Sequence, residues 1–448
     1  MRQPNVVLVF GDQWRAQATG YAGDPNVKTP NLDALTGESI NFVNALAGCP
    51  VCSPYRASLL TGQFPLTNGV FVNDVYLSEE AVSLADAYSA AGYDTAYIGK
   101  WHIDGHGRSS YIPPERRQGF DYWKVLECTH NYSHSPYYAG GSDENLFWEG
   151  YDAIAQTRDA QHYIQEHDDA KPFLLVLSWG PPHNPYETAP EEYREMYDSE
   201  KIQLRSNVPD THAEQARKDL AGYYAHCSAL DACVGDLLKT LQEEGIEDDT
   251  IFVFTSDHGD MIGSQAHQRK QRPWDESIRV PFLLRYPAIL GRQSKELDAL
   301  IDAPDIMPTL LGLCDLPVPE AVEGLDFSGY IRGGENPSDG AAVIMCPHPF
   351  GEWTRPRNGG MEYRGLRTLR HTYVRTLKGP WLLYDNQKDP YQLNNLINKP
   401  EYSETQAELG SWLQRRLDAM NDEFLTGMDY IQKWGYPVNE NGTVPYNP

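Results

Sequence analysis

The chain has 448 residues, of which 40% are hydrophobic and 22% are charged, which is the composition of a globular protein. Its 37 Lys and Arg residues stand against 63 Asp and Glu residues, giving a formal net charge of −26. Nucleic acids and anionic membranes require a basic surface, so we expect neither as a partner. If the substrate is an anion, basic side chains must be gathered locally in a pocket.

The amino terminus shows no signal peptide. Its apolar run, VVLVF, is short and ends in Gly-Asp, and no later segment reaches the roughly 20 apolar residues of a membrane-spanning helix. We therefore expect a cytoplasmic protein as the sequence stands, or a periplasmic or secreted one if a leader has been removed. The sequence makes no prediction of the oligomeric state.

Short apolar segments alternate with helical patterns along the first three quarters of the chain. Buried strands are predicted within the segments 5–10, 93–102, 172–186 and 250–260. The third breaks into a Pro-rich loop around His183, and the fourth ends before Asp257 and His258. Helices are predicted at 83–92 and 212–245, with Cys227 and Cys233 as core residues of the second. Strands alternating with helices are typical of an α/β sheet covered on both faces.

Each predicted strand is followed by polar side chains of the types that bind metals or anions. In chain order these are Asp12 and Gln13, Lys100 and His102, His183, and Asp257 and His258. Because ligands bind beyond the carboxyl ends of the strands in open sheets, we expect these residues to form one site. Carboxylate and amide oxygens with one imidazole suit a divalent ion such as calcium, with manganese or magnesium as alternatives.

The basic residues of this set predict an anionic substrate. Lys100 and His102, one residue apart on an extended chain, are expected to point the same way. Together with Arg56, His183 and Lys270, they would suit a tetrahedral oxyanion in an otherwise acidic protein.

The composition and the pattern of predicted elements change near the last quarter of the chain. A connection rich in Gly, Pro and Ser covers 333–341, followed by strand-like pieces within 363–376 and a helical pattern at 401–424. We predict a catalytic domain at residues 1–335 and a smaller C-terminal subdomain at 336–448.

The stretch GCPVCSPYRASLLTG, residues 48–62, can be interpreted in two ways. Cys49 and Cys52 have the spacing of a redox dithiol or of half a zinc site. A zinc site would need a second Cys or Cys/His pair, which the other cysteines do not supply, and Pro50 and Pro54 give a context unlike a thioredoxin motif. The second interpretation concerns Cys52 alone, as the start of C-S-P-Y-R.

Residues 52–62, CSPYRASLLTG, resemble the signature of the type I sulfatases, C-x-P-x-R followed by x-x-x-L-T-G. Further blocks resemble the family in the same order, namely PNVVLVFGDQWR, TPNLDALTGESINFVNA, GYDTAYIGKWH, PPHNPY, TSDHGDMIGS, WDESIRVPFLLRYP and LLYDNQKDPYQLNNL. The resemblance implies an alkaline-phosphatase-like α/β sandwich with a large, mostly parallel or mixed central sheet flanked by helices, plus a smaller C-terminal α+β subdomain.

The resemblance also implies roles for individual residues. Cys52 would be oxidised to formylglycine, the catalytic aldehyde, by a formylglycine-generating maturation enzyme, and Arg56 would hold its charge. The metal would be bound by Asp12, Gln13, Asp257 and His258 with the oxygen of the converted Cys52. The sulfate would be gripped, and protons handled, by Lys100, His102, His183 and Lys270, with either His183 or Lys270 as the acid for the leaving group.

Two positions depart from the family pattern. Many sulfatases have two aspartates where this chain has Asp12 and Gln13, and an asparagine where it has His258. These residues resemble the phosphonate monoester hydrolases of the same superfamily, whereas GKWH, with Lys100 and His102, resembles the sulfatases. We therefore expect a sulfate ester hydrolase, with a phosphonate or phosphate monoester hydrolase as the alternative.

Two further segments bear on the substrate. ECTHNYSHSPYY at 127–138 is rich in aromatic residues and histidines, which suit stacking on a sugar ring. In the segment CPHPFGEWTRPR, we expect His348, Trp353, Arg355 and Arg357 to reach the pocket from the C-terminal subdomain. The expected substrate is a sulfated sugar or short oligosaccharide attacked from one end.

Overall fold

The computed structural model describes residues 3–168, 170–354 and 359–445. Its main element is a ten-stranded sheet of order β10-β2-β9-β8-β1-β7-β3-β4-β5-β6. The strands are β1 Asn5–Asp12, β2 Ile40–Phe42, β3 Asp94–Lys100, β4 Tyr122–Leu126, β5 Pro136–Ala139, β6 Leu146–Phe147, β7 Phe173–Pro182, β8 Thr250–Ser256, β9 Leu283–Arg285 and β10 Lys295–Leu297.

The centre of this sheet is parallel and its margins are mixed. Strands β8, β1, β7, β3 and β4 pair in parallel, whereas β9 pairs antiparallel with β8 and β5 antiparallel with β4. The five parallel strands therefore end at the same edge, which is where an α/β sheet binds its ligands.

Both faces of the sheet are buried, and alternate residues of each central strand enter different cores. In β1, Val6 and Leu8 belong to one hydrophobic cluster, and Val7 and Val9 belong to another. This follows from the two-residue period of a strand, since successive side chains point to opposite faces. An apolar run such as VVLVF is therefore typical of a strand buried on both sides.

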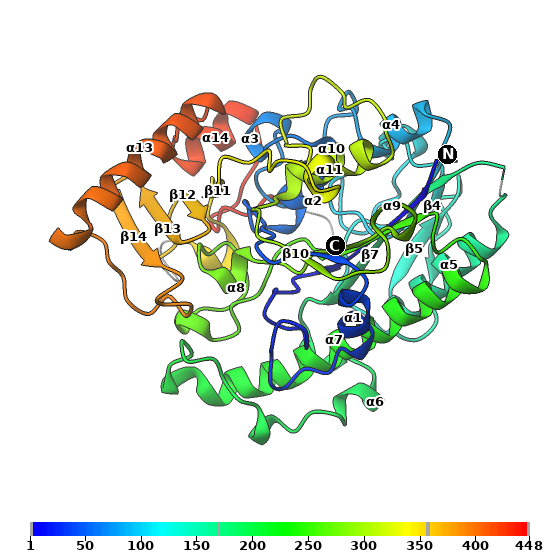
Figure 1. Ribbon diagram of the computed structural model, residues 1–448, viewed down its shortest axis with the longest axis horizontal. Coiled ribbons are helices and arrows are strands. Elements are labelled where there is room, and N and C mark those ends of the chain that lie inside the picture. Colours follow the sequence, from blue (N-terminus) through cyan, green and yellow to red (C-terminus); the bar gives the residue numbers. More distant parts are fainter. Residues whose placement is uncertain (1–2, 169, 355–358, 446–448) are drawn as a thin grey trace.

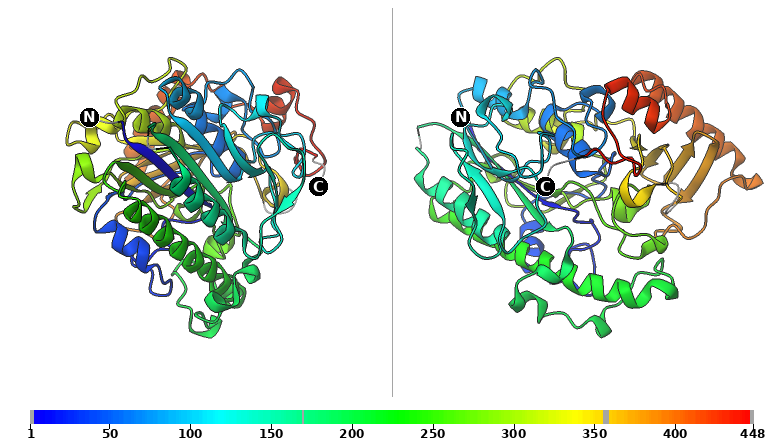
Figure 2. Two further views of the ribbon diagram at one scale, coloured as in Figure 1. Left: turned by 90° about the vertical axis from the view of Figure 1, so that its right-hand side faces the viewer. Right: turned by 180° about the vertical axis from the view of Figure 1, so that it is seen from behind.

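Helices cover the two faces. Their bounds are α1 Pro30–Thr36, α2 Cys52–Thr61, α3 Pro65–Asn68, α4 Leu84–Ala90, α5 Asp152–Glu166, α6 Glu191–Arg194, α7 Ala213–Glu243, α8 Asp275–Ile278, α9 Pro287–Leu290, α10 Ala303–Leu313, α11 Ser328–Ile331, α13 Ser403–Ala419 and α14 Gly427–Trp434. The long α7 runs beside α5 on one face, and α2 packs with α10 on the other (Figures 1 and 2).

The carboxyl-terminal part forms a second, antiparallel sheet of order β11-β12-β13-β14, seen at the left of Figure 1. Its strands are β11 Ala341–Cys346, β12 Tyr363–Thr368, β13 His371–Thr376 and β14 Gly379–Asp385. Helix α13 packs against β12 and β13. The boundary between 1–335 and 336–448 stays a prediction, because a hydrophobic cluster continues from the large sheet into this part of the chain.

The observed elements differ from the expected ones mainly at their ends. The strand predicted within 172–186 ends at Pro182, and the predicted Pro-rich loop around His183 follows it. The helix expected at 401–424 ends at Ala419 and is followed by α14. Cys227 and Cys233 are buried in α7, as predicted.

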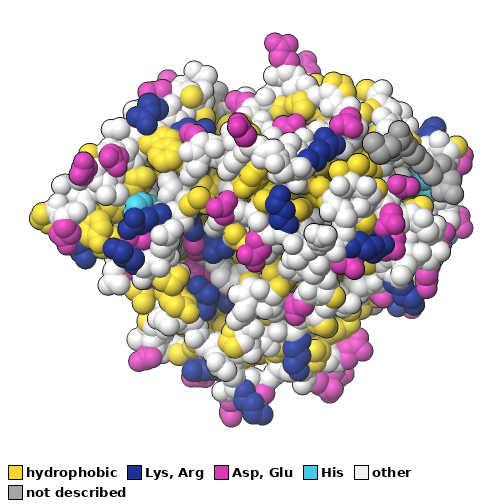
Figure 3. All heavy atoms as spheres, in the orientation of Figure 1, with side chains coloured by type: hydrophobic (Ala, Val, Ile, Leu, Met, Phe, Trp, Pro, Cys, Tyr) yellow, Lys and Arg dark blue, Asp and Glu magenta, His cyan; other side chains and the backbone are white. Residues whose placement is uncertain are grey.

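Acidic side chains are spread over the molecular face seen in Figure 3, with Lys and Arg residues interspersed among them. Among the described residues, no helix is long and apolar enough to cross a membrane. The overall fold agrees with the expectation of a large mixed sheet flanked by helices with a smaller antiparallel sheet beside it.

Candidate active site

The residues predicted to form one site lie together at the carboxyl edge of the large sheet. Their positions are Asp12 at the end of β1, Lys100 at the end of β3, His183 directly after β7, Asp257 and His258 directly after β8, and Cys52 at the start of α2. Because β8, β1, β7 and β3 are consecutive in the sheet, their ends bring these side chains side by side.

Four of these side chains form a buried group suited to a cation. Ligand-type atoms of Asp12, Cys52, Asp257 and His258 all lie within 4.8 Å of one another, and none of the four residues is more than 1% exposed. Two carboxylates and a thiol this close together in a dry environment require nearby positive charge.

The ring of His258 is oriented so that one nitrogen faces this group. Its Nδ1 lies 2.9 Å from the carbonyl oxygen of Gly259, which can only accept, so Nδ1 carries the hydrogen. Nε2 therefore faces the carboxylates of Asp12 and Asp257, at 3.7 and 3.6 Å. Burial lowers the pKa of His258, but Asp257 outweighs this and the net shift is upward, as expected for a nitrogen placed among carboxylates.

Gln13 presents an amide oxygen with no hydrogen-bond partner. The residue is fully buried with a φ of 72°, and its Nε2 donates to Oδ2 of Asp260 at 2.6 Å. Its backbone N–H donates to Asp257 at 2.9 Å, while Oε1 has no partner among the described residues. An unpartnered buried oxygen beside a carboxylate group is what an additional metal ligand requires.

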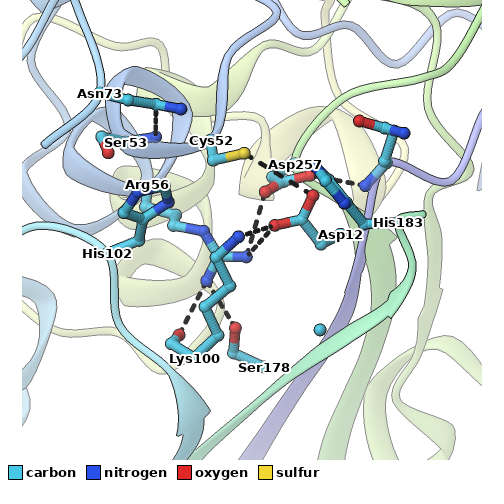
Figure 4. A network of polar contacts seen from close by, with 12 residues as sticks. Asp12, Cys52, Ser53, Arg56, Asn73, Lys100, His102, Ser178, His183 and Asp257 are labelled. Atoms are coloured by element: carbon cyan, nitrogen blue, oxygen red, sulfur yellow. Dashed lines mark hydrogen bonds and ion pairs between the residues drawn. The ribbon is translucent and has the colours of Figure 1, made fainter. Parts of the chain in front are cut away.

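Arg56 lies beneath the carboxylates and joins several elements. It sits one helical turn after Cys52 on α2, and its Nη2 contacts Asp12 and Asp257 at 3.2 and 3.1 Å. Its Nη1 donates to the Lys100 carbonyl at 2.8 Å and to Ser178 at 2.6 Å (Figure 4). The guanidinium therefore directly compensates the negative charge of the two carboxylates. Its effect on Cys52 is indirect, through these carboxylates.

The two carboxylates have opposite pKa shifts. Burial raises the pKa of Asp12, but Lys100, whose Nζ lies 2.5 Å from Oδ2, and further cations bring it well below its ordinary value. Burial and the neighbouring Asp12 raise the pKa of Asp257. Asp257 is thus the carboxylate of this pair that more readily takes up a proton.

A pocket of about 220 Å³ opens above the buried group. Five of the predicted residues line it, namely Cys52, Lys100, His102, His183 and Lys270. The Lys270 Nζ lies 2.8 Å from the Cys52 sulfur, 3.2 Å from Nε2 of His183 and 3.5 Å from Nε2 of His258. The ammonium of Lys270 beside the sulfur, with that of Lys100 in the same pocket, forms the local cationic centre that an acidic protein needs to bind an anion.

The groups around Cys52 favour the anionic form of its side chain. Burial and Asp12 raise the pKa of its thiol, but Lys100, Lys270 and His258 outweigh them, so the pKa lies well below its ordinary value. As the first residue of α2, Cys52 also lies at the positive end of a ten-residue helix. The same features would stabilise negative charge on any group at position 52.

His183 is neutral and stacked on another histidine. Its Nδ1 donates to the carbonyl oxygen of Asn184 at 2.8 Å, so Nε2 accepts from Lys270. Burial and Lys270 keep the pKa of His183 well below its ordinary value. The ring of His130, from the predicted aromatic loop, lies 4.6 Å from that of His183, and burial and Lys100 lower its pKa to about 3.

His102 is held by a carboxylate that the sequence had not indicated. Its Nε2 lies 3.3 Å from Oδ1 of Asp74, which also accepts two hydrogen bonds from Arg108, each at 2.8 Å. The buried Nδ1 of His102 has no partner in the part of the chain that the structure describes. The expectation of an extended chain at Lys100 and His102 is wrong, because His102 has a φ of 61°, yet both side chains reach the pocket.

Comparisons with known proteins agree with this arrangement. The sequence matches the sulfatase family over residues 4–316, and the family of N-sulphoglucosamine sulphohydrolase carboxyl-terminal regions over residues 263–419. The chain belongs to the sulfatase family. It is therefore an enzyme that hydrolyses sulfate esters.

The relatives of this sulfatase extend over the whole chain. It is 46% identical to an ulvan-active sulfatase of Formosa agariphila over 99% of this chain and 87% of that protein. A sulfatase structure from Bacteroides fragilis has a TM-score of 0.86 at 31% identity and covers 96% of this chain and 98% of its own. The phosphonate monoester hydrolase of Agrobacterium radiobacter, at 24% identity, 99% and 100% coverage and a TM-score of 0.76, shares the fold. The expectation of an alkaline-phosphatase-like fold is thus confirmed.

Cys49 is not part of the site of the sulfatase. It is 6% exposed, and burial raises the pKa of its thiol well above the ordinary value, which is the opposite of the shift at Cys52. The group of clustered ligand atoms contains Cys52 without Cys49. The C-x-x-C spacing therefore forms neither a redox dithiol nor half a zinc site here.

The C-terminal contribution to the pocket differs from the expected one. Phe350, Gly351 and Glu352 line it, whereas His348 is buried with Nε2 bonded to the Gly442 carbonyl at 2.8 Å. Trp353 packs in the core of the smaller sheet. The predicted Arg355 and Arg357 lie outside the described residues.

Several residues of the site had not been singled out from the sequence. They are Asp74, Arg108, His130, Asp260 and Arg272. Asp260 could have been found from the block TSDHGD, where it is the third residue of a metal-binding type, after Asp257 and His258. His130 lies in the segment 127–138, which had been noted as a whole for its aromatic residues and histidines. The sequences around Asp74, Arg108 and Arg272 carry no such signal, because the relation of these residues to the site depends on contacts between distant segments.

Proposed function

We propose that the protein removes a sulfate ester from a sugar or short oligosaccharide, working from one end of the chain. The observation that supports this best is the pocket, where Lys270 contacts the sulfur of Cys52 and Lys100, paired with Asp12, lines the same wall above a buried group of carboxylates. The relative that acts on ulvan supports a carbohydrate substrate. The small volume and the surrounding walls favour an end of a chain over its middle.

Asp12, Gln13, Asp257 and His258 would hold a divalent metal together with the oxygen at position 52. The donor set fits, since it offers carboxylate oxygens, the unpartnered amide oxygen of Gln13 and a ring nitrogen already turned inward. Oxygen ligands favour calcium, and the imidazole leaves manganese or magnesium as outcomes of a metal titration. When bound, the metal supplies positive charge that acidifies the nucleophilic hydroxyl.

Residue 52 would act as formylglycine, made from Cys52 by a formylglycine-generating maturation enzyme. The hydrate of this aldehyde has two hydroxyls, so one can attack sulfur and the other can later expel sulfate. The cysteine sulfur stands in the structure for the hydroxyl oxygens. Its contacts with Lys270 and His258, at 2.8 and 3.3 Å, support the proposal that these side chains would surround them.

The remaining residues have roles that follow from their proton positions. Asp257, with its raised pKa, takes the proton of the attacking hydroxyl. Because His183 keeps its hydrogen on Nδ1 and accepts at Nε2, the proton available to the leaving oxygen lies on Lys270. His102, with Nε2 held by Asp74 and Nδ1 unpartnered, is the base for the second hydroxyl.

Lys100 and Lys270 would also stabilise the charge that develops on the sulfate oxygens. Both are nearly buried, at 6% and 9% exposure, so their charges are weakly screened by solvent. Removal of one preorganised group of this kind typically lowers the rate by on the order of a hundredfold.

The mass of the peptide containing Cys52 tests this mechanism directly. Conversion exchanges sulfur for oxygen and removes two hydrogens, so the peptide from active protein should be about 18 Da lighter than the cysteine form. An unconverted peptide in fully active protein, or full activity of Cys52→Ala, would rule the mechanism out.

A comparison of rates separates this function from the alternative. Gln13 and His258 are the positions that resemble the phosphonate monoester hydrolases, so matched sulfate, phosphate and phosphonate esters should be assayed under the same conditions. Sulfate esters are expected to be the fastest. Phosphorus esters faster by orders of magnitude would replace the proposed function with the alternative one.

A further inference from the structure

Arg272 lies in the wall of the active-site pocket with its guanidinium buried and without a carboxylate partner. The residue is 2% exposed and lines the pocket near Phe350. Among the residues that the structure describes, no Asp or Glu oxygen lies within 4.0 Å of its nitrogens, and Nε has no hydrogen-bond partner. A buried cation without a counterion is unfavourable unless a ligand supplies the negative charge.

The other Lys and Arg residues that line the pocket have partners or a clear purpose. Lys100 pairs with Asp12 at 2.5 Å, Arg108 with Asp74 at 2.8 Å, and Arg269 with Glu352 at 3.4 Å. Lys270 has no carboxylate within ion-pair distance in the described part of the chain, but it contacts Cys52, where the scissile sulfate is expected. Binding of the scissile sulfate therefore accounts for the charge of Lys270 but not for that of Arg272.

The local fold does not require that charge. The backbone N–H of Arg272 bonds to Ser277, one guanidinium N–H donates to the Lys270 carbonyl, and the guanidinium carbon lies 4.3 Å from the centre of the Trp353 ring. Burial lowers the pKa of Arg272 to about 10, so the side chain is still a cation near neutral pH.

Arg272 and Lys270 lie two residues apart in one short loop, and both line the pocket. The side chain of Gln271, between them, makes two hydrogen bonds with the backbone of Phe350, at 3.1 and 3.2 Å. These bonds hold the C-terminal wall of the pocket against the loop. Lys270 thus lies at the position of the reacting sulfur, and Arg272 lies in the wall next to it.

We propose that Arg272 binds a second anionic group of the substrate, so that the enzyme acts on a sugar sulfate that also carries a carboxylate or another sulfate. Carboxylate and sulfate both match the planar N–H donors of a guanidinium. This inference rests on the proposed function, since it names the class of substrate for the same pocket.

The experiment compares substrates that differ in one anionic group. Four sulfate esters are assayed with the matured enzyme: an aryl sulfate, a neutral sugar monosulfate, the same sugar sulfate with a carboxylate, and the disulfated sugar. The parent enzyme should prefer at least one dianionic sugar over the neutral one. Arg272→Met should lower kcat/KM for that substrate about 10- to 100-fold and change the aryl sulfate rate by less than about threefold.

Three controls give the result its meaning. Arg272→Lys keeps the charge and should restore part of the preference. Arg269→Met tests the neighbouring pocket arginine, and Arg194→Met removes an exposed arginine that does not line the pocket. Comparison of the carboxylate-bearing sugar sulfate with the disulfated sugar tells which anionic group is bound. Loss of the preference in Arg269→Met but not in Arg272→Met would overturn the inference.

The outcomes separate this inference from the proposed function. Turnover of the aryl sulfate reports the sulfatase reaction, whereas the ratio of dianionic to neutral sugar sulfates reports Arg272. If no ester is hydrolysed, the same ratio is measured as binding affinity by calorimetry, on the unconverted protein. If Arg272→Met does not fold, the preference for the dianionic sugar sulfate is compared between Arg272→Lys and the parent instead. A parent enzyme without any preference for the second anionic group contradicts the inference.

Discussion

The side-chain amide of Gln13 donates to Oδ2 of Asp260 at a distance of 2.6 Å, and both residues are fully buried. This bond fixes which end of the amide faces the carboxylate group, because only the NH₂ end can donate. Asp260 also accepts from the hydroxyl of Tyr186 and from the backbone N–H of Arg269. One carboxylate thereby joins the loop after β1, the loop after β7 and the loop that carries Lys270.

Replacement of Asp260 should weaken metal binding. In Asp260→Asn, the new amide can accept from Gln13 with only one oxygen, and the three loops lose a charged acceptor. We expect metal affinity to fall about 10- to 100-fold, as is usual for residues that orient metal ligands. Calorimetric titration of the metal-free protein with calcium, and then with manganese, measures this without an assay. Tyr186→Phe, which keeps the bond to Gln13, should bind metal nearly as well as the parent. Equal affinity in Asp260→Asn would show that the bond does not position a ligand.

Replacement of Arg56 by lysine should strongly lower catalytic activity, although it conserves the positive charge. Lys has one charged nitrogen and cannot reach two carboxylates, the Lys100 carbonyl and Ser178 at once. We expect kcat/KM of Arg56→Lys to fall on the order of a hundredfold or more. Arg364→Lys is the matched control, because Arg364 is also fully buried and paired with a carboxylate, that of Asp422, in the carboxyl-terminal part of the chain.

Both variants should unfold at a lower temperature than the parent, since each leaves a buried carboxylate poorly paired. Only Arg56→Lys should lose activity in the part of the sample that is folded. Equal loss of activity in the two variants would mean that Arg56 acts through stability alone.

Replacement of Asp74 should disturb the base proposed for the second hydroxyl. Burial raises the pKa of Asp74, but hydrogen bonds from His102 and Arg108 outweigh this and lower it, so the carboxylate stays ionised. Asp74→Asn removes the negative charge that faces the His102 ring and leaves a single oxygen to accept from both His102 and Arg108. We expect kcat to fall about 10- to 100-fold with a smaller change in KM.

Asp104→Asn is the control for Asp74→Asn. Asp104 is also buried and held by an arginine, Arg116, whose Nε lies 2.7 Å away, but it does not line the pocket. Its kcat should stay within about threefold of the parent. The assignment of His102 fails if Asp74→Asn keeps the parent kcat.

Glu127 should make the stability of the fold depend on pH. Burial raises its pKa to about 8, above its ordinary value, so the folded state holds a proton that the unfolded state releases. The stabilisation is fully present below the ordinary pKa, near 4.5, and is lost as the pH rises through about 8. Its size is on the order of a few kcal/mol.

Urea unfolding at a series of pH values measures this effect. The Glu127 Oε1 accepts from the backbone N–H groups of Asp104 and Gly105, which a glutamine oxygen can also do. Glu127→Gln should therefore stay folded and lose less stability between pH 5 and 8 than the parent. Glu149→Gln, at an exposed glutamate, should leave the slope unchanged. Parallel slopes for parent and Glu127→Gln would contradict the prediction.

Much of the fold and part of the site could be predicted because they depend on local patterns. The apolar run of β1 and the polar pair that follows it are neighbours in sequence, so their relation needs no knowledge of distant segments. The same holds for Asp257 after β8 and His183 after β7. Parallel strands place such residues at a common edge, and this rule, together with the signature that begins at Cys52, was enough to predict one site.

The tertiary structure decided the partners of those residues. The bond between Gln13 and Asp260 joins positions 247 residues apart, and Lys270 lies 218 residues from the Cys52 sulfur it contacts. No periodicity or spacing encodes such contacts, because they arise when loops from different strands pack against one another.

The sequence by itself therefore determined the family, the α/β sheet and the residue types at its carboxyl edge. Only the folded chain decided which nitrogen of His183 accepts, which carboxylate holds His102 and which arginine in the pocket lacks a counterion. The physical reason is that chemical type is a property of one residue, whereas pKa, proton position and charge compensation are set by every group packed around it.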